Sequence, residues 1–310
     1  MSLSPRLRWR FDQIRRKTTS AFIGEKDPPR PKLCPSCGTL VGATATRCHQ
    51  CGASLTFSLA AASKSLSRLM PTTSPATYAI LALSVLIYVV SLLVTIRMSG
   101  SLPIGGGLFG LLGLGGVNSA VLQRLGESVP LGIILFLKEP WRLVTAIFLH
   151  ASLLHIVFNM WVLMDIGPQI EELYGSARFL FMYVACGIGG FVLSSGLGHF
   201  SVGGSGAIVG LVGVLLALTT GRQSIGMRML RSQLIRWLIY LAIWGFIVPG
   251  VDNSAHIGGL ATGFILGKIL VDRLPATVQE RRNAHVLGWA AALAVIASFV
   301  MAALKALRVT

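Results

Sequence analysis

The sequence predicts an all-α membrane protein, on three observations. Of its 310 residues, 53% are hydrophobic and only 12% are charged, whereas soluble domains carry about 25% charged residues. The mean hydropathy is +0.71. Apolar runs that approach the about 20 residues needed to cross a bilayer recur along the chain. We predict a bundle of seven transmembrane helices, at residues 76–98, 153–170, 179–197, 207–220, 233–248, 255–271 and 286–304.

The first of these helices is followed by an eighth apolar stretch, residues 102–117. It is too short and too rich in glycine to span a bilayer comfortably. We interpret it as an interfacial or re-entrant segment.

The net charge of +16 indicates how the chain is oriented in the membrane. With a cytoplasmic N-terminus, 21 of the 27 Lys and Arg residues fall on the inner side, as the positive-inside rule requires. In the basic cytoplasmic arm, residues 1–30, the cluster from Arg6 to Lys17 either contacts anionic headgroups or is simply solvated. We therefore expect a lipid bilayer and no nucleic acid as partner. That arm shows no signal-peptide pattern. We predict a multi-pass protein of a bacterial inner (cell) membrane.

Two CxxC pairs precede the first predicted helix. They consist of Cys34 with Cys37 and Cys48 with Cys51, each pair followed by glycine. Four thiolates at this spacing suit tetrahedral zinc, and so short a module needs metal to fold. A cytoplasmic location argues against disulfides, and paired knuckles argue against a lone redox motif. We predict a structural zinc ribbon over 31–54, serving regulation or a cytoplasmic partner, and a linker over 55–75.

Polar residues inside membrane helices are costly, so each is a functional candidate. His155 and Asn159 are four apart and share a helix face, with His150 off that face at the membrane edge. His256 lies one turn inside another predicted helix, and Ser205 stands at the start of a third. The predicted topology puts all of them at one depth, just below the outer surface.

Ser205 lies between glycines in the stretch GGSG, at a helix start where backbone N–H groups are unpaired. Glycine lets the backbone approach closely and turn an N–H toward a developing charge. A serine that faces a histidine there has a base within reach and donors for an oxyanion. Taken singly, Ser205 is more often a helix cap, His256 a core histidine and Asn159 an interhelical hydrogen bond. Their convergence favours catalysis.

Glycines recur at every fourth position of the helix that carries His256, at Gly259, Gly263 and Gly267. Gly206 and Gly210 offer a matching face after Ser205. Such small-xxx-small faces permit close helix contact, which would bring His256 to Ser205.

These residues resemble the rhomboid intramembrane serine proteases. The matching motifs are Trp141-Arg142, then His150, His155 and Asn159, the GxSG of 203–206, and Ala255-His256 with Gly259 and Gly263. The resemblance covers residues 76–273 and implies a rhomboid-like bundle that cleaves transmembrane-helix substrates near the extracytoplasmic surface, with no catalytic cofactor. Carried over residue by residue, Ser205 is the nucleophile and His256 the base. We assign the oxyanion group to His155, Asn159 and Gly203.

The sequence also departs from the family pattern. Val209 occupies a position where the family usually has an aromatic that stacks on the histidine. The seventh helix, within 274–310, matches the family's six-plus-one variant, and the cysteine module lies outside the family core.

Two other functions fit parts of the pattern. A non-catalytic relative would bind transmembrane helices without cutting them, but such proteins typically lose the serine or the histidine, and this chain keeps both. A secondary transporter could also use glycine-rich broken helices. The sequence shows no inverted repeat and no acidic cluster at mid-depth, which argues against it.

Overall fold

The computed structural model describes residues 31–34, 39–51, 74–100, 116–270 and 272–308. The chain divides into two compact units, Met1–Leu69 and Met70–Thr310. The first contains an antiparallel pair of two-residue strands, β1 (Lys32–Leu33) and β2 (Leu40–Val41), with Lys32 opposite Val41.

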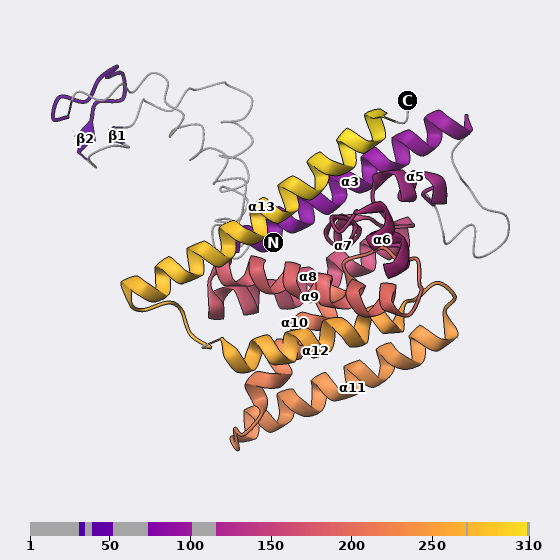
Figure 1. Ribbon diagram of the computed structural model, residues 1–310. Coiled ribbons are helices and arrows are strands. Elements are labelled where there is room, and N and C mark those ends of the chain that lie inside the picture. Colours follow the sequence, from indigo (N-terminus) through magenta and orange to yellow (C-terminus); the bar gives the residue numbers. More distant parts are fainter. Residues whose placement is uncertain (1–30, 35–38, 52–73, 101–115, 271, 309–310) are drawn as a thin grey trace, which may run out of the picture. The chain divides into compact units, whose positions relative to one another are not determined.

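The second unit is helical (Figure 1). Its helices are α3 (Pro75–Ser99), α5 (Ser119–Leu125), α6 (Leu131–Leu137), α7 (Arg142–Thr145), the 3-10 turn η1 (Ala146–Phe148), α8 (Leu153–Tyr174), α9 (Ser176–Gly196), α10 (Ser205–Thr219), α11 (Ile225–Ile247), α12 (Asn253–Ile269) and α13 (Val278–Arg308). Each of the seven predicted helices corresponds to one of the seven long helices.

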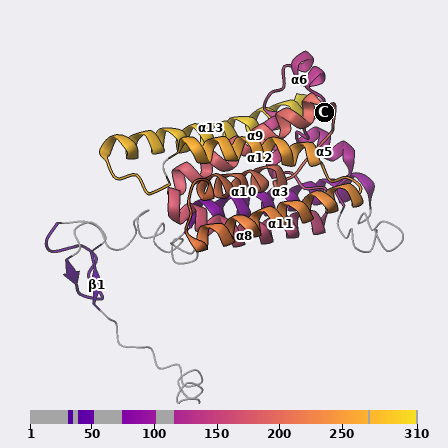
Figure 2. The ribbon, with the colours of Figure 1, turned by 90° about the horizontal axis from the view of Figure 1, so that it is seen from below.

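Helix α10 lies in the middle of the bundle (Figure 2), in contact with α8, α9, α11 and α12. Every residue from Gly206 to Val214 is buried. With 15 residues, α10 is about 22 Å long, shorter than the about 30 Å of a hydrocarbon core. The helix that begins at Ser205 is therefore both enclosed and short.

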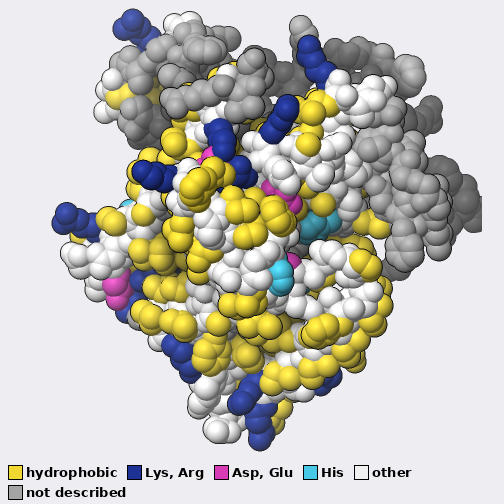
Figure 3. Space-filling view, turned by 45° about the vertical axis from the view of Figure 1, so that its right-hand side comes forward, with side chains coloured by type: hydrophobic (Ala, Val, Ile, Leu, Met, Phe, Trp, Pro, Cys, Tyr) yellow, Lys and Arg dark blue, Asp and Glu magenta, His cyan; other side chains and the backbone are white. Residues whose placement is uncertain are grey.

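The surface of the bundle is apolar where that of a soluble protein would be polar. Helix α3 buries Thr77, Ser84 and Ser91 against its neighbours, while Leu86 and Leu93 are each 60% exposed. Small inward residues and large outward ones are typical of helices packed in lipid. Hydrophobic side chains form broad patches on the face shown in Figure 3. The chain is thus a multi-pass membrane protein.

Length and composition separate the helices into two groups. Within the described residues, α3, α8, α9 and residues Val278–Leu307 of α13 are long and apolar enough to cross a bilayer. Helix α10 is apolar but shorter, and α12 has 17 residues. Helix α11 begins eight residues before the predicted 233, because the Ser224 side chain caps it by accepting a hydrogen bond from Met227 N–H. Most of the predicted interfacial segment 102–117 lies outside the described residues.

A buried carboxylate joins the first and second long helices. Glu171 of α8 accepts hydrogen bonds from the N–H groups of Ala76 (2.9 Å) and Thr77 (2.8 Å), and from the Thr77 hydroxyl (2.7 Å). These donors lie in the first turn of α3, where backbone N–H groups have no intrahelical acceptor. Glu171 therefore fixes the start of α3 against α8.

Candidate active site

The turn before α10 depends on two glycines. Gly203 has φ +125°, a conformation that side-chain-bearing residues rarely adopt. A Cβ on Gly203 would lie 2.6 Å from His155 Nε2, and one on Gly204 would lie 2.7 Å from the Tyr183 hydroxyl. Neither position has room for a side chain, so the chain passes close to both neighbours and presents Ser205 as the first residue of α10.

The structure brings Ser205 and His256 together. Ser205 Oγ lies 3.0 Å from His256 Nε2, within hydrogen-bond distance. His256 is in the first turn of α12 and is 7% exposed. Its other ring nitrogen, Nδ1, is buried with no hydrogen-bond partner in the part of the chain that the structure describes. The pair therefore has no third, acidic member within the described residues.

The contact between α10 and α12 is made by backbone atoms. A Cβ on Gly259 would overlap the carbonyl oxygen of Gly206, and one on Gly263 would overlap that of Gly210. Farther along, a Cβ on Gly267 would lie 2.8 Å from the Val214 carbonyl oxygen. The predicted glycine faces do meet, and this close approach lets His256 reach Ser205.

His155 and Asn159 lie beside Gly203 in this turn. A Cβ on Gly203 would be 3.6 Å from Asn159 Nδ2. That nitrogen is buried and has no hydrogen-bond partner among the described residues, an arrangement that is costly unless a ligand or water accepts from it. His150 packs its ring against that of His155, with centroids 5.1 Å apart, and is fully buried. Both predicted side-chain donors therefore border the Gly203 turn that leads to Ser205.

The backbone N–H of Gly203, the third residue of the predicted oxyanion group, already has an acceptor. The Gly203 N–H donates to the carbonyl oxygen of Ala146 at 2.9 Å, so it is already used within the fold. Gly203 instead provides the space that His155 occupies. The N–H of Ser205 has no acceptor in its own helix, because it stands at the first helical position.

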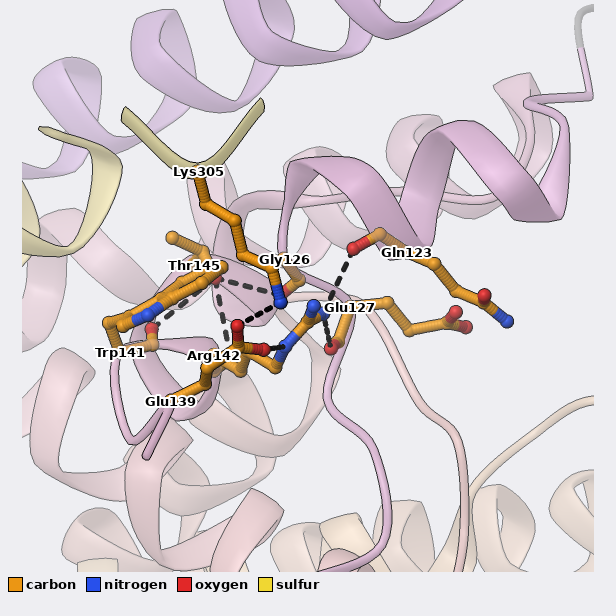
Figure 4. Close-up of polar contacts among 8 residues, drawn as sticks. All are labelled: Gln123, Gly126, Glu127, Glu139, Trp141, Arg142, Thr145 and Lys305. Atoms are coloured by element: carbon orange, nitrogen blue, oxygen red, sulfur yellow. Dashed lines mark hydrogen bonds and ion pairs between the residues drawn. The ribbon is translucent and has the colours of Figure 1, made fainter. Parts of the chain in front are cut away.

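Arg142, of the Trp141-Arg142 motif, organises the loop that supports the turn (Figure 4). Its guanidinium donates to Glu139 Oε2 at 2.6 Å and to the carbonyl oxygens of Gln123 (2.9 Å) and Glu127 (3.0 Å). Lys305 of α13 pairs with the other oxygen of Glu139. Burial alone would raise the pKa of Glu139, but hydrogen bonds from Lys305 and Arg142 outweigh it and lower the pKa below the usual value.

This loop continues into η1, whose Ala146 carbonyl holds Gly203. The Trp141-Arg142 motif thus supports the Gly203 turn through the backbone of η1. Arg142 itself is buried, and its guanidinium is surrounded by hydrogen-bond acceptors. Glu139 and Ala146 were not predicted from the sequence. A carboxylate three residues before the arginine was the available signal for Glu139, whereas a backbone carbonyl leaves no signal in a side-chain pattern.

Three of the four predicted metal ligands lie together in the first unit. The Sγ atoms of Cys34, Cys48 and Cys51 are all within 4.8 Å of one another, and Cys34 Sγ lies 3.7 Å from Cys51 Sγ. Thiolates on tetrahedral zinc, with Zn–S of about 2.3 Å, are about 3.8 Å apart. Cys37 lies outside the described residues. The three described thiols therefore fit a tetrahedral metal.

Fold and site together define a multi-pass helical membrane protein with a partly buried Ser–His pair. Residues 137–273 match the Rhomboid domain. The chain is 36% identical over 184 residues to RHOMBOID-like protein 6, mitochondrial, of Arabidopsis thaliana, covering 56% of this chain and 57% of that protein. It is 40% identical over 133 residues to Rhomboid protease GluP of Bacillus subtilis, covering 43% and 26%.

A third relative is Putative rhomboid protease YdcA of Bacillus subtilis, 35% identical over 147 residues, which cover 46% of this chain and 71% of that protein. The chain belongs to the rhomboid family. It spans less than two thirds of the length of the Arabidopsis protein and of GluP.

Proposed function

We propose that the protein is an intramembrane serine endopeptidase that uses Ser205 and His256 to cleave transmembrane helices near the extracytoplasmic surface. The observation that carries this proposal is the 3.0 Å approach of Ser205 Oγ to His256 Nε2 inside a helical membrane bundle. The relatives named as rhomboid proteases support the same reaction class.

In this mechanism His256 Nε2 takes the Ser205 proton as Oγ attacks the scissile carbonyl carbon. The resulting oxyanion accepts hydrogen bonds from Asn159 Nδ2, His155 and the Ser205 N–H. His256 then gives its proton to the departing amine, which breaks the peptide bond and leaves an ester on Ser205. A water molecule, deprotonated by His256, attacks the ester carbon, and the returned proton restores the serine.

The proposed depth of cleavage follows from topology. The charge distribution supports a cytoplasmic N-terminus in a bacterial cell membrane, which directs the starts of α10 and α12 outward. Because α10 is about 22 Å long, a helix ending at the inner surface would start below the outer one. Ser205 would then lie inside the membrane, at a depth that water reaches from outside.

Substrate choice follows from the state of a peptide bond in a membrane helix, which is hydrogen-bonded and shielded. A test substrate with Gly or Pro near its outer end should be cut faster than its Leu counterpart, because Gly and Pro weaken helices by about 1 and 3 kcal/mol. Mass spectrometry of products from reconstituted protein would map the bond, with Ser205→Ala as control. A cut near the cytoplasmic end of the substrate would contradict the topology and the mechanism.

We further propose that Cys34, Cys37, Cys48 and Cys51 hold one structural zinc ion, in a module that regulates the enzyme or binds a cytoplasmic partner. Elemental analysis should find one zinc per chain, lost in Cys34→Ser and Cys48→Ser, because three thiolates hold the ion less well than four. Cys186→Ser, which alters a buried cysteine of α9, should keep its zinc.

The cysteine variants should still react with a fluorophosphonate, because the helical unit has its own packed interior. Purified protein without zinc would refute the metal site. Loss of fluorophosphonate labelling in Cys34→Ser would refute the independence of the two units.

A further inference from the structure

Asp252 stands at the N-cap of α12, four residues before His256. Its carboxylate accepts a hydrogen bond from the Ala255 N–H at 3.1 Å, and others from the hydroxyls of Ser254 and, at the end of α9, Ser194. The Asp252 carbonyl also accepts from the His256 N–H at 3.2 Å. Asp252 therefore fixes the turn that carries His256 and joins it to α9.

The segment that leads to Ser205 reaches the same carboxylate. His199 Nδ1 lies 3.0 Å from the Ser254 hydroxyl and 3.6 Å from Asp252 Oδ1. Burial raises the pKa of Asp252, but hydrogen bonds from Ser194, Ser254, the Ala255 N–H and Ser201 outweigh it and lower the pKa. His199 and Ser201 belong to the loop between α9 and α10, six and four residues before Ser205.

The loop is held from its other side as well. Ser201 and Ser128 exchange two backbone hydrogen bonds of 3.0 Å, and the Ser128 and Ser195 hydroxyls lie 2.8 Å apart. Its position is therefore set between the segment before α6 and the start of α12. The Asp252 carboxylate therefore lies next to both the loop that leads to Ser205 and the helix that bears His256.

We propose that Asp252 is a positioning residue that sets the geometry of Ser205 relative to His256, an inference that rests on the proposed protease function. It acts through the helix cap, the hydroxyls of Ser194 and Ser254 and the nearby His199 of the loop. It makes no hydrogen bond to the imidazole of His256, whose Nδ1 has no hydrogen-bond partner among the described residues. Asp252 is therefore not the acid of a catalytic triad.

The test compares Asp252→Ala and Asp252→Asn with Ser224→Ala, which removes the cap of α11, a helix that carries neither Ser205 nor His256. Asp252→Ala should lower kcat on a transmembrane substrate about a hundredfold at unchanged KM, as expected for a displacement of about 1 Å between reacting groups. Asp252→Asn keeps a capping oxygen and should recover most of that loss. Ser224→Ala should keep the wild-type kcat even where its melting temperature falls.

Hydrogen exchange gives a readout independent of activity. Asp252→Ala should accelerate exchange in both 197–204 and 253–258, whereas Ser224→Ala should change neither. The proposal is overturned if wild type is active and Asp252→Ala keeps its kcat, or if exchange in 197–204 does not change. If wild type neither cleaves nor reacts with a fluorophosphonate but the exchange result holds, the protease function fails while the positioning by Asp252 stands.

Discussion

Ser205→Ala and His256→Ala should each abolish cleavage of a transmembrane substrate while leaving the protein folded. The loss should be about a millionfold in kcat, the size seen when either member of a serine–histidine pair is removed. The double variant should be no worse than either single one, because the two side chains act as one unit. The loss can be measured by substrate cleavage and by covalent labelling with a fluorophosphonate, because both reactions depend on Ser205 Oγ.

Matched controls separate chemistry from folding. Ser232→Ala removes a serine hydroxyl from α11, and His285→Ala removes an exposed histidine from α13. Both should keep wild-type rates. Substantial cleavage by Ser205→Ala with its melting temperature unchanged would show that Ser205 is not the nucleophile.

Asn159→Ala should lower kcat by about a hundred- to a thousandfold, the usual cost of one oxyanion donor, with little change in KM. The reason is that Asn159 Nδ2 is buried without a partner among the described residues, so its hydrogen bond is available to a charge that develops in the reaction. Steady-state kinetics on a transmembrane substrate would separate the two constants.

Gln169→Ala is the control, because it removes an amide from the same helix at an exposed position. It should change neither constant. If Asn159→Ala raised KM and left kcat intact, Asn159 would belong to substrate recognition and not to catalysis.

The long helices were accessible to sequence reasoning because lipid makes their apolar runs continuous. Helices α11 and α13 were the exceptions at their starts, which each lie eight residues before the predicted ones. Charged residues interrupt the hydropathy there, at Arg228 and Arg231 in α11 and at Glu280, Arg281 and Arg282 in α13. The short elements α5, α6 and α7 were not predicted. They are four to seven residues long, too short for a helical period to show, and tertiary hydrogen bonds such as those of Arg142 hold them.

For the site, the sequence located the side chains that come together but not what holds them. The proximity of Ser205 and His256 followed from glycine spacing and shared depth. The engagement of Gly203 N–H by Ala146 could not be predicted, because it depends on where a distant backbone carbonyl lies. Asp252 was missed because an acidic residue before a helix looks like an ordinary cap until the loop bearing His199 is folded against it.

The glycine contact between α10 and α12 also determines which parts of the protein can move. Where Gly259 and Gly263 meet the carbonyls of Gly206 and Gly210, the interface contains no side-chain torsion that could rotate to absorb a displacement. A displacement of one helix is therefore passed directly to the backbone of the other. If the protein cleaves transmembrane helices as proposed, room for a substrate helix must come from movement of other elements. Among the seven long helices, α11 buries the fewest of its described residues, Leu234 alone, and so loses the least packing when it moves.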